Sequence, residues 1–399
     1  MTTVSAVSHS KYSERELLAF LLSHAEFNEN PVAVWRLPGN DTTNVIIADN
    51  YEELKGDDLI EDRPTGFLFA PFDKSKPRLF LRANQFFSFR DGDLVSDPAP
   101  FEERSQQWLR EQLQGEIHIP RYTPRKIKRA TVKDLTKDAF LQLVDAGLRE
   151  IDAGRFRKIV PSRTRTITLP DEFEVVQAFQ KLCIAHPQAL ISFVSIPGVG
   201  TWLGATPELL VCVRDKKIFK TVALAGTLPH HAGTDIRSVA WTQKEIEEQA
   251  LVERYVISCF KKIRLREYDE QGPRTVIAGN LMHLKSEFTV DIQATNFPQI
   301  GSVMLELLHP TSAVCGMPLE PSLAFLKDHE PHDRGFYSGY LGPVNVHNNI
   351  ELFVNIRCMQ LAGNEAILYA GAGITIDSVP DKEWAETEMK LNTLLNVIL

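Results

Sequence analysis

The hydrophobic pattern changes along the chain and predicts both helices and strands. Apolar residues recur at helical spacing over residues 133–154, which predicts an amphipathic helix that Gly154 can end. Thr242-Gln-Lys-Glu245 has the form of a capping box and predicts a long helix from there to about residue 264. A helix is also expected after Pro380, because proline is well tolerated in a first helical turn. Further helices are expected at residues 14–24, 172–186, 298–308 and 320–328.

Short apolar runs between turn residues predict that much of the remaining chain is β-structure. These runs are residues 31–48, 65–89, 158–160, 189–196, 201–205, 209–213, 219–225, 337–344, 350–358 and 366–370. The helices and strands do not alternate regularly, as they do in a parallel βαβ sheet, and the helices are too numerous for an all-β protein. We therefore expect an α/β chain of the α+β kind, with large mixed or antiparallel sheets and helices packed outside them.

The composition is that of a folded protein, with 43% hydrophobic and 24% charged residues. The 399 residues exceed an ordinary domain but are compatible with one large α/β unit. Residues 1–115 carry little sign of chemistry. The basic, proline-containing tract at residues 119–129 is interpreted as a solvated connection rather than a binding patch.

Charge, hydrophobicity and cysteine spacing exclude several kinds of binding partner and site. The net charge of −8 argues against nucleic acid or an anionic membrane as the main partner. No apolar run approaches the ~18–20 residues of a membrane span, and the N-terminus has no apolar core of the signal-peptide type. The five cysteines are scattered without a CxxC spacing, which fits reduced thiols and gives no zinc site. We expect a cytoplasmic protein and a monomer.

Two predicted helices each carry two glutamates three residues apart, so that each pair shares one helical face. The pairs are Glu245 with Glu248, and Glu383 with Glu386. Together they could form an all-oxygen site for a hard cation such as Mg²⁺. The spacing alone leaves an alternative open, in which both are ordinary acidic faces, Glu245 only caps its helix, and Glu386 pairs with Lys390.

One lysine and one glutamate are candidates for acid–base chemistry. Lys158 lies close in sequence to Arg155, Arg157 and Arg163, and a lysine that is crowded by cations or desolvated can act as a general base. Glu208 precedes an apolar strand, and burial between apolar segments raises the pKa of a carboxyl and suits a general acid. The alternatives are a solvated lysine at a strand end and a capping glutamate.

Candidate anion-binding groups lie near the end of the chain. Strand alternation over residues 352–357 places Phe353, Asn355 and Arg357 on one face, and an arginine at a strand end can bind a carboxylate through two parallel hydrogen bonds. The backbone N–H groups of residues 371–373, in a glycine-rich turn, could bind a carboxylate as well. An edge arginine and an ordinary turn are the alternatives. His283 and His309 have apolar sequence neighbours, and such histidines are usually structural.

Ten short motifs occur in the order found in the chorismate-utilising enzymes. They are KIVPSR, GATPELL, ALAGT, KEIEEQ, MHL, LHPTSAVCG, RGFYSGYLG, NIRC, GAGI and DSVPDKEWAETEMK. From about residue 130 to 399 the chain resembles this family, which includes isochorismate synthases, salicylate synthases, anthranilate synthase component I and aminodeoxychorismate synthase component I. The resemblance implies one α/β domain in which large antiparallel sheets enclose a cleft with helices outside. Residues 1–115 would be the variable N-terminal part of this fold, and residues 130–399 the chorismate-binding catalytic region. It also implies chorismate as substrate and Mg²⁺ as cofactor.

The resemblance implies roles for individual residues by matching position. Glu248 and Glu386 would bind Mg²⁺, and Glu245 and Glu383 would assist, directly behind them or through water. Lys158 would activate water, and Glu208 would protonate the departing hydroxyl. The implied substrate-binding residues are Gly226, Thr227, His283, Ala313, Tyr337, Arg357, Gly371, Gly373 and Lys390. The family usually has histidine where this chain has Gln249, which puts the support of the neighbouring Glu248 in question.

Three positions favour one reaction within the family. Isochorismate and salicylate synthases resemble this chain in having lysine at position 158, which enzymes that add ammonia generally lack. Aminodeoxychorismate enzymes tend to have lysine where this chain has Ala225, and we expect no fused glutaminase. Salicylate-forming relatives tend to have threonine in place of Ala313. These features predict an isochorismate synthase of menaquinone or siderophore biosynthesis. A salicylate synthase, an anthranilate-type synthase and a silent chorismate-binding protein are the alternatives.

Overall fold

A computed structural model describes residues 12–95, 100–114, 122, 134–230, 235–278 and 280–399. The basic tract at residues 119–129 lies outside the described residues except for Tyr122, so its predicted role as a connection stays a prediction. No helix in the described part of the chain has the length and hydrophobicity needed to cross a membrane. The five cysteines are free thiols.

Two antiparallel sheets, each of nine strands, form the centre of the structure. Sheet A has the order β7 (Asp93–Leu94), β6 (Gln85–Arg90), β2 (Thr43–Ile47), β1 (Val32–Arg36), β10 (Leu190–Ile196), β11 (Gly200–Thr206), β19 (Cys358–Ala362), β20 (Glu365–Gly371) and β9 (Ser162–Thr168). Sheet B has the order β14 (Asp269–Ala278), β15 (Leu281–Asp291), β13 (Ile218–Pro229), β12 (Leu209–Arg214), β18 (Ile350–Val354), β17 (Tyr340–Val344), β4 (Gly66–Ala70), β5 (Arg78–Arg82) and β3 (Tyr51–Leu54). A small third sheet pairs β8 (Lys158–Ile159) with β16 (Gly316–Met317).

Strands from the N-terminal part are interleaved with strands from the rest of the chain. In sheet A, β1 pairs with β10 and places Val32 opposite Ser195. In sheet B, β4 pairs with β17 and places Phe69 opposite Leu341. Because residues 1–115 contribute to both sheets, we propose that the N-terminal part and the rest form one structural domain.

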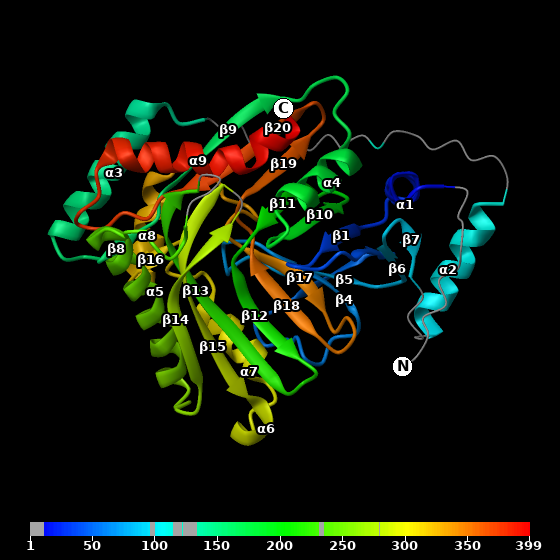
Figure 1. Ribbon diagram of the computed structural model, residues 1–399, viewed down its shortest axis with the longest axis horizontal. Helices are drawn as coiled ribbons and strands as arrows, with labels where there is room; N and C mark the ends of the chain where they lie inside the picture. Colours follow the sequence, from blue (N-terminus) through cyan, green and yellow to red (C-terminus); the bar gives the residue numbers. More distant parts are fainter. Residues whose placement is uncertain (1–11, 96–99, 115–121, 123–133, 231–234, 279) are drawn as a thin grey trace.

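The helices lie on the outside of the sheets (Figure 1). They are α1 (Glu14–Phe27), α2 (Pro100–Gln112), α3 (Lys137–Asp152), α4 (Val175–Ala185), α5 (Gln243–Lys262), α6 (Ile292–Thr295), α7 (Ile300–Leu308), α8 (Leu319–His329) and α9 (Pro380–Ile398). Helix α9 crosses the top of the view beside α3, and α5 runs along β13 and β15. The predicted fold class, large antiparallel sheets with helices outside, is confirmed.

Apolar side chains of the described residues form four clusters. One of them joins α3 and α8 beside the short strand β8, and the other three hold the large sheets and their helices together. Of these three, one joins α1, α4 and α9 to sheet A, and a second joins α5 and α7 to sheet B. The third lies between the two sheets, where the rings of Trp35 and Phe67 are 5.2 Å apart. Tyr337 and Tyr369 belong to this inner layer and stack at 5.2 Å. The same two tyrosines line the cavity described below, so the inner core forms one wall of the candidate site.

Candidate active site

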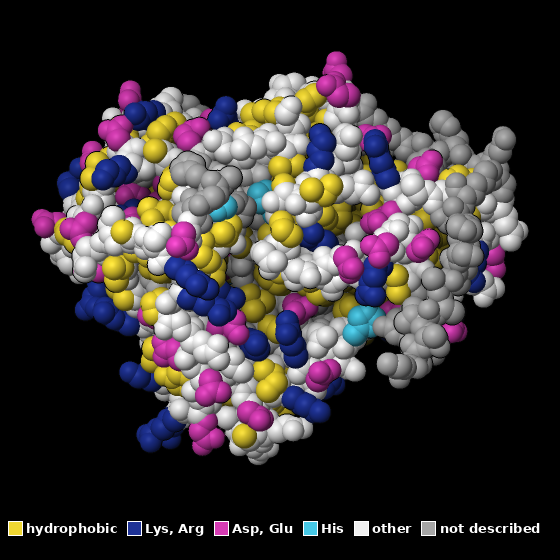
Figure 2. Space-filling view, viewed as in Figure 1, with side chains coloured by type: hydrophobic (Ala, Val, Ile, Leu, Met, Phe, Trp, Pro, Cys, Tyr) yellow, Lys and Arg dark blue, Asp and Glu magenta, His cyan; other side chains and the backbone are white. Residues whose placement is uncertain are grey.

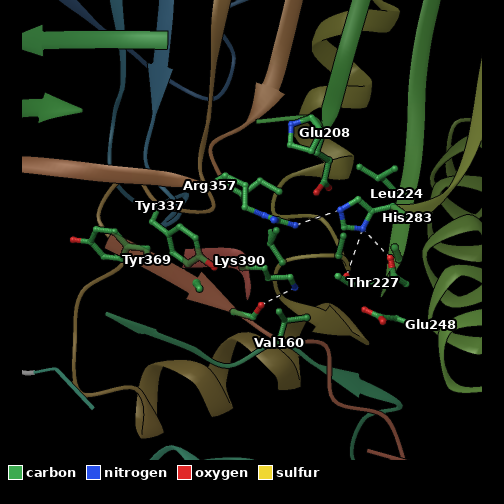
Figure 3. Close-up of a pocket in the computed structure, with 18 residues that line it drawn as sticks. Val160, Glu208, Leu224, Thr227, Glu248, His283, Tyr337, Arg357, Tyr369 and Lys390 are labelled. Carbon is green, nitrogen blue, oxygen red and sulfur yellow. Dashed lines mark hydrogen bonds between the residues drawn. The ribbon is translucent and has the colours of Figure 1, made fainter. Parts of the chain in front are cut away.

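A cavity between the strand ends of both sheets collects most of the residues singled out from the sequence. The space between its side chains, including the part open to solvent, is about 580 Å³. The lining residues are Val160, Pro207, Glu208, Leu224, Ala225, Gly226, Thr227, Glu248, His283, Ala313, Val314, Tyr337, Ile356, Arg357, Tyr369, Ala370, Gly371 and Lys390. Figure 3 shows Glu208 on one side of this space and Glu248 on the other.

The structure separates the predicted residues into those at the cavity and those behind it. Of the predicted substrate-binding residues, all but Gly373 line the cavity, as do Glu208 and Glu248. Lys158, Glu245, Glu383 and Glu386 do not line it. Lys158 reaches the site through Glu248, which its ammonium contacts.

Lys158 is fully buried on the short strand β8, and its Nζ lies 2.9 Å from Oε1 of Glu248. The contact is a close ion pair rather than a well-aligned hydrogen bond. The expected crowding of Lys158 by arginines is wrong, because the arginine side chains lie against other residues. Arg155 is exposed and pairs with Glu150, and Arg163 lies over the ring of Trp384.

Glu248 is held at this position by charge and by close packing. Its burial raises its pKa, but Lys158 and Lys244 outweigh burial and hold the pKa of Glu248 below its ordinary value. Gly373 packs against both partners of the ion pair. A Cβ at Gly373 would lie 2.2 Å from Oε1 of Glu248 and 3.1 Å from Cε of Lys158. Gly373 therefore serves the site by leaving room for this pair.

Glu208 lies between β11 and β12 and is 5% exposed. Burial raises the pKa of Glu208 to about 7, against smaller opposing contributions from Lys158 and from Thr311. The Thr311 hydroxyl donates to Oε1 of Glu208 over 3.4 Å. A carboxyl with this pKa holds its proton over much of the neutral range, as a general acid requires. The direction of the predicted pKa shift is confirmed.

Two carboxylates of α9, those of Glu383 and Glu386, are buried and form ion pairs with lysines. Nζ of Lys390 lies 2.7 Å from Oε1 of Glu386 and donates to the carbonyl of Gly371 over 2.8 Å. Nζ of Lys244, on α5, lies 2.8 Å from Oε1 of Glu383 and 3.8 Å from Oε2 of Glu386. Burial, together with the charge of Glu386, raises the pKa of Glu383 to about 7. Glu386 and Lys390 form the expected pair, but in a buried setting.

Two residues of α5 act locally. The carboxylate of Glu245 accepts from the backbone N–H of Thr242 over 3.1 Å, which confirms the capping box. The amide of Gln249 donates to the carbonyl of Ala223 and to Glu253, each over 3.2 Å. Gln249 therefore ties α5 to β13 and does not contact Glu248 through any of these bonds.

The carboxylates have the chemistry of a magnesium site, although they are not assembled as a cage. Among the described residues no group of three or more His, Cys, Asp or Glu side chains lies in a metal-binding arrangement. Mg²⁺ usually takes one or two protein carboxylates, and its other ligands are water and substrate oxygens. Glu248 and Glu386 supply such a pair. Oε2 of Glu383 is buried without a hydrogen-bond partner among the described residues, which leaves an acceptor for a cation or its water. These residues fit the ion.

Arg357 lines the cavity, but the prediction that strand alternation places it there is wrong. Strand β18 ends at Val354, and Arg357 adopts φ 48° between β18 and β19. This left-handed conformation turns the buried guanidinium toward His283, whose Nε2 accepts from it over 3.4 Å (Figure 3). Burial lowers the pKa of Arg357 to about 10. The side chain is still a cation at neutral pH.

His283 is neutral, and its tautomer follows from its partners. Burial, reinforced by Arg357, lowers the pKa of His283 to about 3. Nδ1 lies 2.8 Å from the carbonyl oxygen of Gly226, which can only accept, so Nδ1 carries the proton. Nε2 is then the acceptor that faces Arg357. His283 lines the cavity and also orients the guanidinium.

The glycine-rich turn offers fewer backbone donors than expected. The N–H of Ala372 donates to the carbonyl of Pro161 over 3.2 Å, so this donor of residues 371–373 is already engaged. Gly371 lies against Tyr337, since a Cβ there would be 3.0 Å from the phenol oxygen. The turn therefore places Tyr337 and Lys390 beside one another at the cavity.

Sequence reasoning missed three residues that the structure places at the site. Lys244 bridges two helices, Thr311 binds Glu208, and Tyr369 lines the cavity by stacking on Tyr337. The motif KEIEEQ contains Lys244, but its first-turn position gave no sign that its side chain would reach another helix. The other two depend on packing between distant segments and have no local signal.

The model of the family described as chorismate binding enzyme matches residues 78–399. The chain belongs to this family. The isochorismate synthase EntC of Escherichia coli strain K12 is 30% identical over 248 residues, which cover 60% of this chain and only 62% of EntC. The vibriobactin-specific isochorismate synthase of Vibrio cholerae is 25% identical over 340 residues, 84% of this chain and 79% of the relative.

A solved structure shows the same fold for this chorismate-binding enzyme. The structure of MenF, the menaquinone-specific isochorismate synthase from Escherichia coli, is similar with a TM-score of 0.75 at 20% identity. The similarity covers 100% of this chain and 96% of MenF. At this identity the likeness establishes the fold, and the reaction has to be argued from the cavity.

Proposed function

We propose that this chorismate-binding enzyme is an isochorismate synthase, an isomerase that adds water at C2 of chorismate and removes the C4 hydroxyl. The observation that carries the proposal is the placement of two groups with opposite tasks. Glu248, which is paired with the buried Lys158 behind it, lies on one side of the cavity, and Glu208, with a pKa of about 7, lies on the other. Figure 3 shows the two glutamates. Base and acid on opposite sides suit an exchange of hydroxyl groups across a ring.

In the proposed reaction Lys158, in its neutral form, takes one proton from water as the oxygen bonds to C2. The ring double bonds shift, and the bond from C4 to its hydroxyl oxygen breaks. Glu208 donates its proton to that oxygen, which leaves as water. One water enters and one leaves, Lys158 gains a proton and Glu208 loses one, so the step balances and solvent exchange restores both groups.

The residues that would hold Mg²⁺ are Glu248 and Glu386, with Glu245 and Glu383 behind them. When bound, the ion supplies positive charge for the ring carboxylate of chorismate. The net charge of −8 makes local compensation necessary for a dianionic substrate. Among the described residues, Lys390 and Arg357 supply cationic charge at the cavity wall.

The enolpyruvyl carboxylate is assigned to Arg357, Tyr337 and the turn at Gly371. Arg357 presents a guanidinium that His283 orients, and Lys390 lies close by, between this turn and Glu386. Gly226 and Thr227 line the neighbouring edge together with His283. Gly226 has φ 67°, and a Cβ there would be 3.1 Å from Cβ of Glu245, so glycine allows β13 to approach α5.

Isochorismate rather than salicylate is proposed as the product because Ala313 lines the cavity. Salicylate-forming relatives tend to have threonine at that position, so the side chain here is smaller and apolar. Both isochorismate and salicylate synthases share lysine at position 158, which favours water over ammonia as the nucleophile.

The test is to incubate the purified protein with chorismate and Mg²⁺ and to separate the products by chromatography. Parallel samples contain EDTA or added ammonium. Isochorismate as main product, lost with EDTA and unchanged by ammonium, is the expected result. Salicylate with pyruvate would overturn the inference from Ala313, and anthranilate would overturn the inference from Lys158. Absence of turnover with Mg²⁺ would favour a silent chorismate-binding protein.

A further inference from the structure

Lys244 has no task in the proposed reaction, yet it lies within the acidic cluster. It occupies the first turn of α5, and its side chain, 15% exposed, extends to α9. There its Nζ lies 2.8 Å from Oε1 of Glu383 and 3.8 Å from Oε2 of Glu386. It does not line the cavity, so its ammonium meets the carboxylates from behind.

Three of the buried carboxylates at the site are each paired with a lysine. Glu248 is paired with Lys158, and Glu386 with Lys390. Glu383 has Lys244 as its ion-pair partner, while its Oε2 has no hydrogen-bond partner among the described residues. Lys158 and Lys390 have proposed tasks toward water and substrate. Of these three lysines, Lys244 is then the one without a proposed task toward water or substrate.

The charge of Lys244 is strongly favoured at this position. Burial opposes the ammonium form, but Glu386, Glu383 and Glu248 together outweigh burial and raise the pKa of Lys244 above its ordinary value. The ion-pair contacts of the ammonium are with Glu383 and Glu386 on α9. Glu248 and Glu386 are the two residues proposed to bind Mg²⁺.

We propose that Lys244 is a built-in substitute for the divalent cation. In the metal-free protein its ammonium neutralises the α9 carboxylates and holds α5 against α9, and Mg²⁺ binds in competition with it. Lys244 is thus a positioning residue that sets the affinity of the metal site and keeps the empty site from being opened by repulsion between carboxylates. The inference rests on the proposed metal site at Glu248 and Glu386.

Competition and a merely structural contact predict opposite changes in Mg²⁺ affinity when Lys244 is removed. A fixed positive charge beside two ligands repels an incoming cation, so its removal should tighten Mg²⁺ binding by about tenfold or more, as a neighbouring charge shifts a proton equilibrium. The same removal leaves the buried carboxylate of Glu383 without an ion-pair partner and should lower the stability of the metal-free protein. If Lys244 only held Glu383 and Glu386 in place for the metal, its loss would weaken Mg²⁺ binding.

The experiment is calorimetric titration of the free protein with MgCl₂ alone, without chorismate, together with thermal unfolding at each Mg²⁺ concentration. Lys244→Gln removes the charge and keeps an N–H donor for Glu383. Lys244→Arg keeps the charge, and Lys261→Gln removes an exposed lysine from the other end of α5. We expect Lys244→Gln to have a Kd for Mg²⁺ about tenfold lower and a lower metal-free Tm that Mg²⁺ restores. Lys244→Arg should bind Mg²⁺ no more tightly than the wild type, and Lys261→Gln should match it.

An unchanged or higher Kd in Lys244→Gln would overturn the proposal. So would a Lys244→Gln protein that fails to fold at any Mg²⁺ concentration, because the ion would then be unable to replace the lysine. Glu248→Gln identifies the site, since it should abolish the binding heat. If the wild type showed no binding heat that depends on Glu248, the metal site itself would be refuted, and the role of Lys244 with it. A wild-type site lost in Glu248→Gln but indifferent to Lys244 would refute the role of Lys244 alone.

Discussion

The ammonium of Lys158 lies 2.9 Å from a carboxylate oxygen of Glu248, and the two side chains are 0% and 8% exposed. The proposed base and a proposed metal ligand therefore neutralise each other. Removing one member of a buried pair leaves an uncompensated charge and costs about 3–5 kcal/mol. Each residue is thus expected to control the chemistry of the other.

Lys158→Ala should lower the turnover of chorismate by ~10²–10⁴, the usual contribution of a positioned acid or base. It should also lower the stability of the metal-free protein, because Glu248 loses its partner. Steady-state assays and thermal unfolding measure the two effects. Lys181→Ala, which removes an exposed lysine on α4, serves as the matched control. Full activity in Lys158→Ala would refute its assignment.

Glu248→Gln and Glu386→Gln should each abolish Mg²⁺-dependent activity, since an amide is a neutral and weaker ligand for a hard cation. EDTA should stop the wild-type enzyme, and added Mg²⁺ should restore it. Glu247→Gln changes an exposed glutamate next to Glu248 and should leave the Mg²⁺ dependence intact. A wild-type rate that is indifferent to EDTA would contradict the metal site.

The pH dependence of the reaction should report Glu208. A general acid works only while protonated, and the pKa of Glu208 is about 7, so kcat/KM should fall as pH rises above this value. The limiting slope is about tenfold per pH unit. Glu208→Gln should lose both the activity and this descending limb in whatever rate is left. A profile that stays flat from about pH 6 to pH 9 would exclude Glu208 as the acid.

Glu208→Gln should stabilise the protein at alkaline pH although it inactivates it. The folded pKa of Glu208, about 7, lies above the ordinary 4.5, so its contribution to stability is present below the ordinary pKa and is lost as pH rises through the folded value. The neutral variant avoids this loss, which amounts to about 3 kcal/mol at high pH. Denaturant unfolding at about pH 5 and pH 8 should show the gain mainly at pH 8. An equal effect at both pH values would mean that Glu208 has the same pKa in the folded and the unfolded protein.

Gly373→Ala should disable the site without a large loss of fold. The added methyl would meet Oε1 of Glu248 at 2.2 Å, so Glu248 and Lys158 would have to move. We expect loss of Mg²⁺ binding and of activity, measured by calorimetry and by product chromatography. Gly56→Ala is the control, because a Cβ there has no neighbour within 4 Å. Normal Mg²⁺ binding by Gly373→Ala would show that the pair tolerates displacement.

The helices that frame the site are readable from local signals. Helix α3 follows its apolar repeat, α5 its capping box, and α9 begins at Pro380 as expected. The predicted bounds were wider than the structure by a few residues at several ends, where helices fray. The long hairpin of β14 and β15 was not predicted, because β14 is mostly exposed and lacks an alternating apolar pattern.

The parts of the site that sequence could not give depend on tertiary structure. The strand alternation predicted for Arg357 is wrong because the strand ends before this residue, which adopts a positive φ. Positive φ values are uncommon for residues other than glycine and are not indicated by the sequence here. The contact of Lys244 with Glu383 joins α5 to α9, which lie far apart in sequence. The order of strands in the two sheets likewise depends on long-range pairing. For Glu208 the sequence predicts that burial raises the pKa, but it does not predict by how much.

The interleaving of the sheets bears on how this protein reaches its native state. Phe69 faces Leu341, and Ser162 faces Gly371, so partners in the sheets come from opposite halves of the chain. Closing such long loops lowers the chain entropy before the long-range contacts contribute favourable free energy, and this slows folding. Neither half can complete a sheet alone. Cleavage of the chain in its middle should therefore leave two fragments with unpaired strand edges, prone to aggregate unless they meet each other.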